Sequence, residues 1–159
     1  MKTTGLLLFA ILLTMALQHE GQAQVYAGGN IGFHYKDGTY LDVAPLIGYR
    51  YNKLDIGISP FLSYRDRRDQ DPRYAYGNRT FAQITFMPNV FVHAEFDVSN
   101  IERADGSRKW INAFPVGGGY RYSLGERTQA YGMVLYDLML DDDSPVEQPI
   151  VRGGIVYSF

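Results

Sequence analysis

The feature that most constrains this chain is a repeated alternation of apolar and polar residues in segments of about ten residues. A period of two places successive side chains on opposite faces, so each segment predicts a β-strand with one apolar face. Turns rich in Gly, Asn and Asp separate the segments, and no later stretch shows a helical period. The expected strands are Val25–Tyr35, Tyr40–Tyr51, Leu54–Tyr64, Tyr76–Phe86, Val90–Val98, Ile111–Tyr122, Thr128–Leu138 and Val151–Phe159. This pattern predicts an all-β, eight-stranded antiparallel up-and-down barrel.

The N-terminal 23 residues follow a different pattern. Lys2 precedes an apolar run from Leu6 to Leu17, and Gly21 and Ala23 provide small residues at positions −3 and −1 of a cleavage site. The run is well below the roughly 20 residues that a membrane-spanning helix needs. We expect residues 1–23 to be a removable signal peptide and residues 24–159 to form the barrel.

The charged residues indicate which face of the strands points inward. Asp42 and Arg50 share one face of a strand, and His93, Glu95 and Asp97 share one face of another. Alternation alone fits both a soluble barrel and a membrane barrel. However, the charged face is also rich in glycine, which suits the crowded interior of a narrow barrel. We therefore expect apolar side chains to face lipid and charged ones to face the lumen.

Loop lengths and aromatic residues favour the same orientation. Tight turns follow the second, fourth and sixth segments, whereas long polar loops follow the third, fifth and seventh, as in outer-membrane barrels. An even number of strands places both termini on the periplasmic side. Aromatic residues gather at the strand ends, in the girdle positions of such barrels. One rim has Tyr49, Phe86, Tyr120, Tyr122, Tyr157 and Phe159, and the other has Tyr35, Tyr64, Tyr76 and Trp110.

The end of the chain resembles that of a known class of protein. Ile155, Tyr157 and Phe159 place an apolar or aromatic residue at every second position up to a terminal Phe. This pattern is similar to the signal that small eight-stranded outer-membrane barrels of Gram-negative bacteria, the OmpA- and OmpX-like class, present to the barrel-assembly machinery. The resemblance covers residues 24–159 and implies an outer-membrane location.

A narrower resemblance covers roughly the last third of the chain. The stretch from Gly117-Gly118-Gly119-Tyr120 through Tyr136-Asp137-Leu138 to Arg152 is similar to a family of short secreted barrel proteins. Some members of that family bear an α-ketoglutarate decarboxylase label. A thiamine-dependent decarboxylase needs large α/β domains to hold its cofactor, and this chain has neither such domains nor a thiamine-diphosphate motif. We therefore expect no cofactor.

The interior of an eight-stranded barrel is only wide enough to be filled by side chains, so we expect no continuous pore. Buried charges need partners, and arginine can donate two hydrogen bonds to one carboxylate. The expected partners form a nearly balanced ion-pair network with a structural role, with a transport or proton-relay site as the less favoured alternative. Its members are Asp42, Arg50, Asp55, Arg79, Glu95, Asp97, Arg121, Asp137 and Arg152, and of these Asp42, Arg79, Glu95, Asp137 and Arg152 are expected in the extracellular half.

Composition excludes several classes of function. The net charge is −2 without a basic block, which disfavours nucleic acid as a partner. The absence of cysteine excludes disulfides, cysteine-ligated metals, a thiol nucleophile and an acylated lipoprotein anchor. Outside the signal peptide the only histidines are His34 and His93, and the nearest hydroxyls, those of Ser59, Ser63 and Thr85, show no triad spacing. We expect no enzyme activity.

The loops are the places where a partner could bind. Arg65, Arg67 and Arg68 could contact phosphates of lipopolysaccharide or an envelope protein, although a solvated loop explains the same run. The run 141–143 of three aspartates lacks the interrupted spacing and the glycine of a calcium loop, so we expect no metal site.

Two functions remain open. The favoured one is a non-enzymatic outer-membrane barrel that serves as a structural envelope component, a surface-binding module or a small subunit of an envelope assembly. The alternative is a soluble periplasmic or secreted, lipocalin-like barrel that binds a small apolar ligand, with its faces inverted. In either barrel Pro45 faces Pro60 across the Asn52-Lys53 turn, which predicts a bulge or kink because proline has no amide donor.

Overall fold

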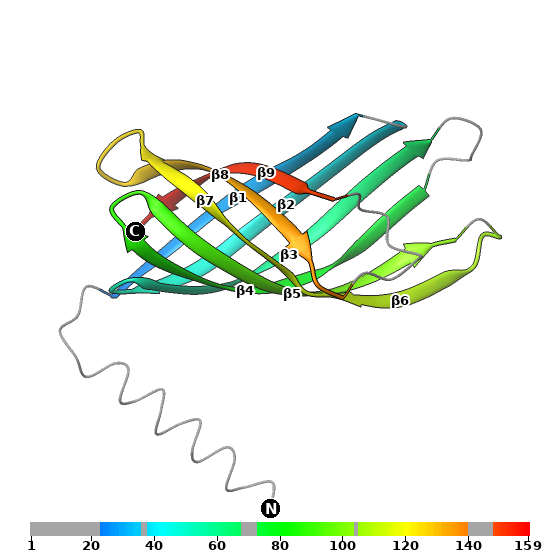
Figure 1. Cartoon of the computed structure of the whole chain (residues 1–159), viewed down its shortest axis with the longest axis horizontal. Coiled ribbons are helices and arrows are strands. Elements are labelled where there is room, and N and C mark those ends of the chain that lie inside the picture. Colours follow the sequence, from blue (N-terminus) through cyan, green and yellow to red (C-terminus); the bar gives the residue numbers. More distant parts are fainter. Residues whose placement is uncertain (1–22, 36–37, 68–72, 104, 140–147) are drawn as a thin grey trace, which may run out of the picture.

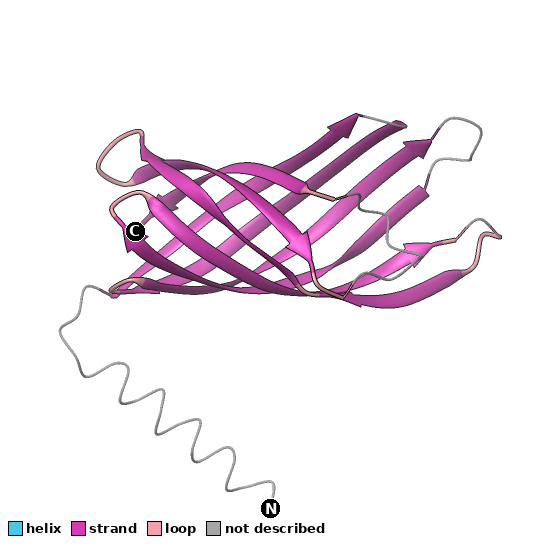
Figure 2. Cartoon of the chain, viewed as in Figure 1, coloured by secondary structure: helices cyan, strands magenta, loops and turns pink. Residues whose placement is uncertain are grey.

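A computed structural model describes residues 23–35, 38–67, 73–103, 105–139 and 148–159. All regular structure in these ranges is β-strand (Figure 2). None of the described residues forms a helix long and apolar enough to cross a membrane. The expected signal peptide lies outside the described residues, apart from Ala23, with which the first strand begins.

Nine strands follow one another along the described part of the chain (Figure 1). They are β1 (Ala23–Tyr35), β2 (Gly38–Tyr51), β3 (Leu54–Arg67), β4 (Arg73–Met87), β5 (Val90–Glu102), β6 (Arg108–Ala113), β7 (Pro115–Ser123), β8 (Thr128–Asp137) and β9 (Ile150–Ser158).

The sheet closes on itself. Its order is β4-β3-β2-β1-β9-β8-β7-β5-β6, and a further antiparallel pairing joins β4 to β5. β6 and β7 pair with successive parts of β5 in one continuous register and together form a single wall strand, interrupted at Phe114. The predicted eight-stranded antiparallel up-and-down barrel is therefore confirmed, with its sixth strand divided in two.

The barrel has a turn end and a loop end. The turn end holds the start of β1, the C-terminus and the short connections at residues 52–53, 88–89 and 124–127 (Figure 1). At the loop end the strands run further than the sequence predicted: β3 reaches Arg67, and β5 and β6 extend to residues 102 and 108. The pattern missed these extensions because polar residues without apolar alternation can still pair in a hairpin.

The β5–β6 connection has the chemistry of a tight turn. Gly106 adopts a positive φ of 77°, which favours glycine. The hydroxyl and the amide of Ser107 donate to the Asp105 carboxylate at 2.6 and 2.8 Å. These hydrogen bonds favour the ionised form and lower the pKa of Asp105. What the sequence suggested was a long loop is therefore a compact hairpin.

Apolar side chains cover the outside of the barrel and polar ones fill the inside. Along β2, for example, Leu41, Val43 and Ile47 are exposed, whereas Asp42 and Ala44 are buried. The same alternation holds in the other long strands. A lipocalin-like barrel would have the opposite arrangement of faces, so the structure opposes that alternative.

The prolines interrupt one ladder without shifting it. Pairing between β2 and β3 stops after Val43↔Leu62 and resumes at Ile47↔Ile58 in the same register. Pro45 therefore faces Pro60 as expected, and the ladder is disrupted there by a gap in the pairing without a register shift, so no bulge forms. Ser59 Oγ donates to Pro45 O at 2.9 Å, so a side chain supplies a donor where the proline cannot. The bulge in the β4–β5 ladder lies elsewhere, between Thr85 and Met87.

Inward-facing aromatic rings lie against glycines of the neighbouring strand. A Cβ added at Gly57 would lie 2.5 Å from both Phe81 Cζ and Ile47 O, and one added at Gly119 would lie 2.5 Å from Phe91 Cζ. Such distances are too short for any real side chain, so only glycine leaves room for the ring. The same register relation joins Tyr26 to Gly48, Phe61 to Gly77, Phe81 to Gly57, Phe91 to Gly119, and Tyr131 to Gly154. This pairing explains the glycine-rich lumen face.

Candidate functional site

The lumen contains two clusters of paired charges. The first, the turn-end cluster, consists of Arg50, Asp55 and Arg121. Arg50 Nε and Nη2 donate to the two oxygens of Asp55 at 2.8 and 3.0 Å. Arg121 reaches across the lumen from β7 and donates to the same carboxylate at 2.9 Å. Two guanidinium groups thus share one buried carboxylate.

The second, the loop-end cluster, consists of Asp42, Arg79, Glu95, Asp97 and Arg152. Arg79 donates two hydrogen bonds to Asp42, at 2.9 and 2.8 Å, and one from Nε to Asp97 at 3.2 Å. Arg152 pairs closely with Glu95 and lies 3.9 Å from Asp97. The Arg79 guanidinium also stacks 3.9 Å from the Phe61 ring centroid. All five residues are buried, so each charge depends on the others.

A hydrogen-bonded bridge joins the two clusters. Arg121 donates to Gln83 Oε1 at 2.7 Å, which turns the Gln83 amide nitrogen toward His93 Nδ1 at 2.8 Å. His93 Nδ1 is therefore an acceptor, and its Nε2–H donates to Glu95 at 2.9 Å. This tautomer is assigned from the network. Sequence reasoning missed Gln83, although it lies on the same face of its strand as Arg79.

Asp137 does not take the expected place in the ion-pair network. Its Oδ1 accepts hydrogen bonds from the backbone nitrogens of Phe114 and Met139 at 2.8 and 3.0 Å. Phe114 is the residue at which the sixth wall strand breaks. The side chain therefore satisfies backbone donors at an interruption of the sheet, and no described cation lies within ion-pair distance of it.

The described interior is filled. Two cavities between its side chains have volumes of about 30 and 10 Å³, space for a water molecule or two at most. The hydroxyls near the histidines are engaged elsewhere, since Ser59 donates to Pro45 O and Ser63 to Ala75 O. His93 contacts Gln83 and Glu95, and the His34 side chain lies outside the described part. No described hydroxyl therefore meets a histidine base in the lumen.

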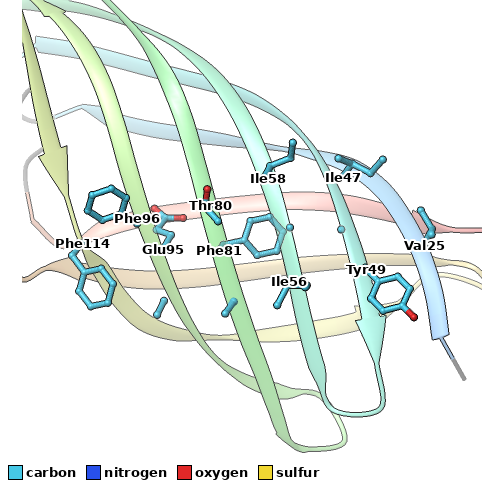
Figure 3. A pocket seen from close by; sticks show the side chains of 14 residues that line it. Val25, Ile47, Tyr49, Ile56, Ile58, Thr80, Phe81, Glu95, Phe96 and Phe114 are labelled. Atoms are coloured by element: carbon cyan, nitrogen blue, oxygen red, sulfur yellow. The ribbon is translucent and has the colours of Figure 1, made fainter. Parts of the chain in front are cut away.

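A broad groove of about 820 Å³ lies on the outer surface across β2–β5. Figure 3 shows Phe96 and Phe114 at one end of it, Val25 at the other and Thr80 between them. Ala82 and Ala94 are paired across β4 and β5, and their short side chains line the groove at this point. The lining is almost wholly apolar.

The other predicted site residues are placed only in part. Arg65 is half-buried, whereas the Arg67 side chain and Arg68 lie outside the described residues, as does the run 141–143. Among the described residues no group of acidic and histidine side chains could hold a metal ion. Ile155, Tyr157 and Phe159 all point outward at the turn end.

Comparison with solved structures shows which known proteins have a similar architecture. The N-terminal β-barrel domain of OprF from Pseudomonas aeruginosa superposes with a TM-score of 0.53 at 18% identity, over 88% of this chain and all of that one. The chain has the fold of a small outer-membrane β-barrel. Neisserial surface protein A gives a TM-score of 0.45 at 13% identity over 86% of this chain and 97% of its own. The designed barrel TMB2.3 gives 0.44 at 11% identity, over 88% of this chain and 97% of its own.

No protein-family model matches this outer-membrane-type barrel, and no curated protein sequence matches it either. The expected resemblance to small outer-membrane barrels is therefore supported by the fold and not by a sequence match. The narrower resemblance to the secreted barrel family stays a prediction.

Proposed function

We propose that this protein is a non-enzymatic outer-membrane barrel with a lumen closed by its own side chains. Its role would be that of a structural envelope component, a surface-binding module or a small subunit of an envelope assembly. The observation that carries the proposal is the division of the wall into an apolar exterior and an ion-paired interior. In water this arrangement would expose the apolar exterior to solvent. In a bilayer the apolar exterior contacts lipid, while the charged side chains stay paired in the lumen.

Strand length supports a membrane-spanning barrel. A tilted strand needs about 9–11 residues to cross a bilayer. β7, β8 and β9 have 9, 10 and 9 residues, whereas β1–β5 have 13–15. The longer strands carry polar residues at the loop end, which we assign to the extracellular side. Hairpins on that side would be available to lipopolysaccharide or to an envelope protein.

The filled lumen argues against a porin, and the engaged histidine argues against a lipid hydrolase. The outward row Ile155, Tyr157 and Phe159 at the turn end suits recognition by the barrel-assembly machinery on the periplasmic side. The outer-membrane lipids themselves are the remaining partner, along the groove and the rest of the apolar face.

Fractionation of cells tests the proposal directly. The protein should stay with the outer membrane until detergent is added, and boiling should change its mobility in gel electrophoresis. Purified protein in a planar bilayer should give no conductance steps, and it should not deacylate lipids. Release with the periplasmic fraction would contradict the membrane location, and stepwise conductance would contradict the closed lumen.

A further inference from the structure

Four aromatic residues form a continuous surface on the outside of the barrel at the loop end. Tyr64 of β3 packs against Tyr74 of β4 with ring centroids 5.3 Å apart. Tyr76 of β4 meets Trp110 of β6 edge to face at 6.3 Å, across Asn100 of β5. Trp110 is 60% exposed although it contacts another ring. These four residues are called the outer aromatic platform below.

The Arg108 side chain is held on this platform. The Arg108 guanidinium lies over the Tyr76 ring, 4.9 Å from its centroid. Nε donates to Asn100 Oδ1, and Nη2 donates to backbone oxygens of Tyr74 and Asn100 at 3.5 and 3.4 Å. Nη1 forms a longer ion pair with Glu102, at 3.7 Å. The guanidinium is thus held by hydrogen bonds along its Nε–Nη2 edge, whereas its Nη1 edge meets Glu102 beyond hydrogen-bond distance.

The platform continues into the apolar surface of the barrel. Leu62 of β3 and Val98 of β5 are exposed on the same outer face, one step closer to the turn end. A ligand that covers both regions must present acyl chains to the aliphatic part and a polar group to the rings and Arg108. Tyr and Trp prefer this depth in a bilayer, where chain meets headgroup. Arginine adds a preference for phosphate, because its guanidinium group donates charge-assisted hydrogen bonds to phosphate oxygens.

From this arrangement we infer that the outer aromatic platform and Arg108 bind the phosphate-bearing headgroup of an anionic lipid, for which phosphatidylglycerol serves as the probe below. The phosphate accepts hydrogen bonds from Nη1 of Arg108, and the acyl chains run along Leu62 and Val98. The inference rests on the proposed membrane location and adds to it a selectivity for anionic lipid at one place on the wall.

Trp110 is the chain's one tryptophan and therefore reports on the lipids beside the platform. The full chain is folded into vesicles of phosphatidylcholine mixed in equal parts with phosphatidylglycerol. In one set only the phosphatidylglycerol carries brominated acyl chains, and in the other only the phosphatidylcholine does. Bromine quenches Trp110 at close range, so the two sets compare the lipids around this residue. We expect stronger quenching by the phosphatidylglycerol, equivalent to an enrichment of about fivefold, and weaker selectivity at high salt.

Two variants that each remove one positive charge distinguish a specific site from a general electrostatic attraction of anionic lipid to the protein. Arg108→Gln should abolish the enrichment. Arg127→Gln removes the same charge from an exposed turn at the opposite end of the barrel and should leave the enrichment unchanged. Equal quenching by both lipids in the unmodified protein, or enrichment that survives Arg108→Gln, overturns the inference while leaving the membrane location intact. If neither lipid quenches Trp110 and aqueous acrylamide does, the proposed membrane location of the platform fails as well.

Discussion

Arg79→Met tests the account of the lumen most directly. Arg79 is 2% exposed and supplies three hydrogen bonds to two carboxylates in the loop-end cluster. Methionine keeps an unbranched chain against Phe61 and removes the charge. Asp42 then loses its bidentate partner, and Asp97 keeps only the longer contact of 3.9 Å with Arg152.

The magnitude follows from how buried ion pairs behave. Removing one partner of a buried pair typically costs about 3–5 kcal/mol, because the remaining charge stays desolvated. Replacing both partners with apolar residues is often nearly neutral. We therefore expect Arg79→Met to lower the free energy of unfolding by about 3–5 kcal/mol. The double variant Arg79→Met with Asp42→Leu should regain most of that loss.

Urea unfolding in phospholipid vesicles measures both quantities, with Trp110 emission and gel mobility as independent readouts. Arg127→Met changes an exposed arginine at a turn and should stay within about 0.5 kcal/mol of the unmodified protein. An Arg79→Met variant as stable as this control would refute the reasoning, since the loop-end cluster would then contribute nothing. A double variant less stable than either single one would refute the pairing of Arg79 with Asp42.

Three further predictions concern the wall and its assembly. Gly57→Ala should destabilise the barrel by about 1–3 kcal/mol, because the added Cβ would meet Phe81 and a backbone oxygen. Gly125→Ala adds a Cβ in open space and should be neutral. Equal urea midpoints for the two variants would contradict the ring packing. Ser59→Ala should cost about 1 kcal/mol through loss of the hydrogen bond to Pro45, measured in the same assay, and no change would show that this bond is dispensable. Phe159→Ala should reduce the amount of heat-modifiable protein in the outer membrane of cells while refolding in vitro stays normal, and normal assembly in cells would remove Phe159 from the signal.

The wall of the barrel could be predicted from the sequence because its period is simple. Asp42 and Arg50 on one strand, and His93 with Glu95 on another, are enough to assign the lumen face once lipid is assumed outside. The ends of the strands are harder to predict, because the hairpin between β5 and β6 is built from polar residues whose pattern is typical of a loop. The break at Phe114 was likewise invisible, because apolar alternation continues through it.

The partners within the lumen could be predicted only where they are local. Arg50 and Asp55 lie opposite each other across a two-residue turn, so their pairing follows from the hairpin. Arg121 joins Asp55 only because the sheet closes and its strands are staggered, and alternation says nothing about stagger. The contact of Asp137 with backbone nitrogens was missed for a related reason, since it depends on where a distant strand is broken.

The hairpin of β5 and β6 has a practical consequence. Beyond Ala113 toward its tip, β6 pairs with β5 and with no other described strand, and the hairpin extends past the ends of β7 and β8 (Figure 1). A side chain at Gly106, in its turn, would meet nothing within 4 Å. A foreign peptide inserted there would lie clear of the lumen and, in the proposed orientation, clear of the membrane. The tip of this hairpin is therefore the site that the proposed function favours for an epitope tag or for displaying a short sequence on intact cells.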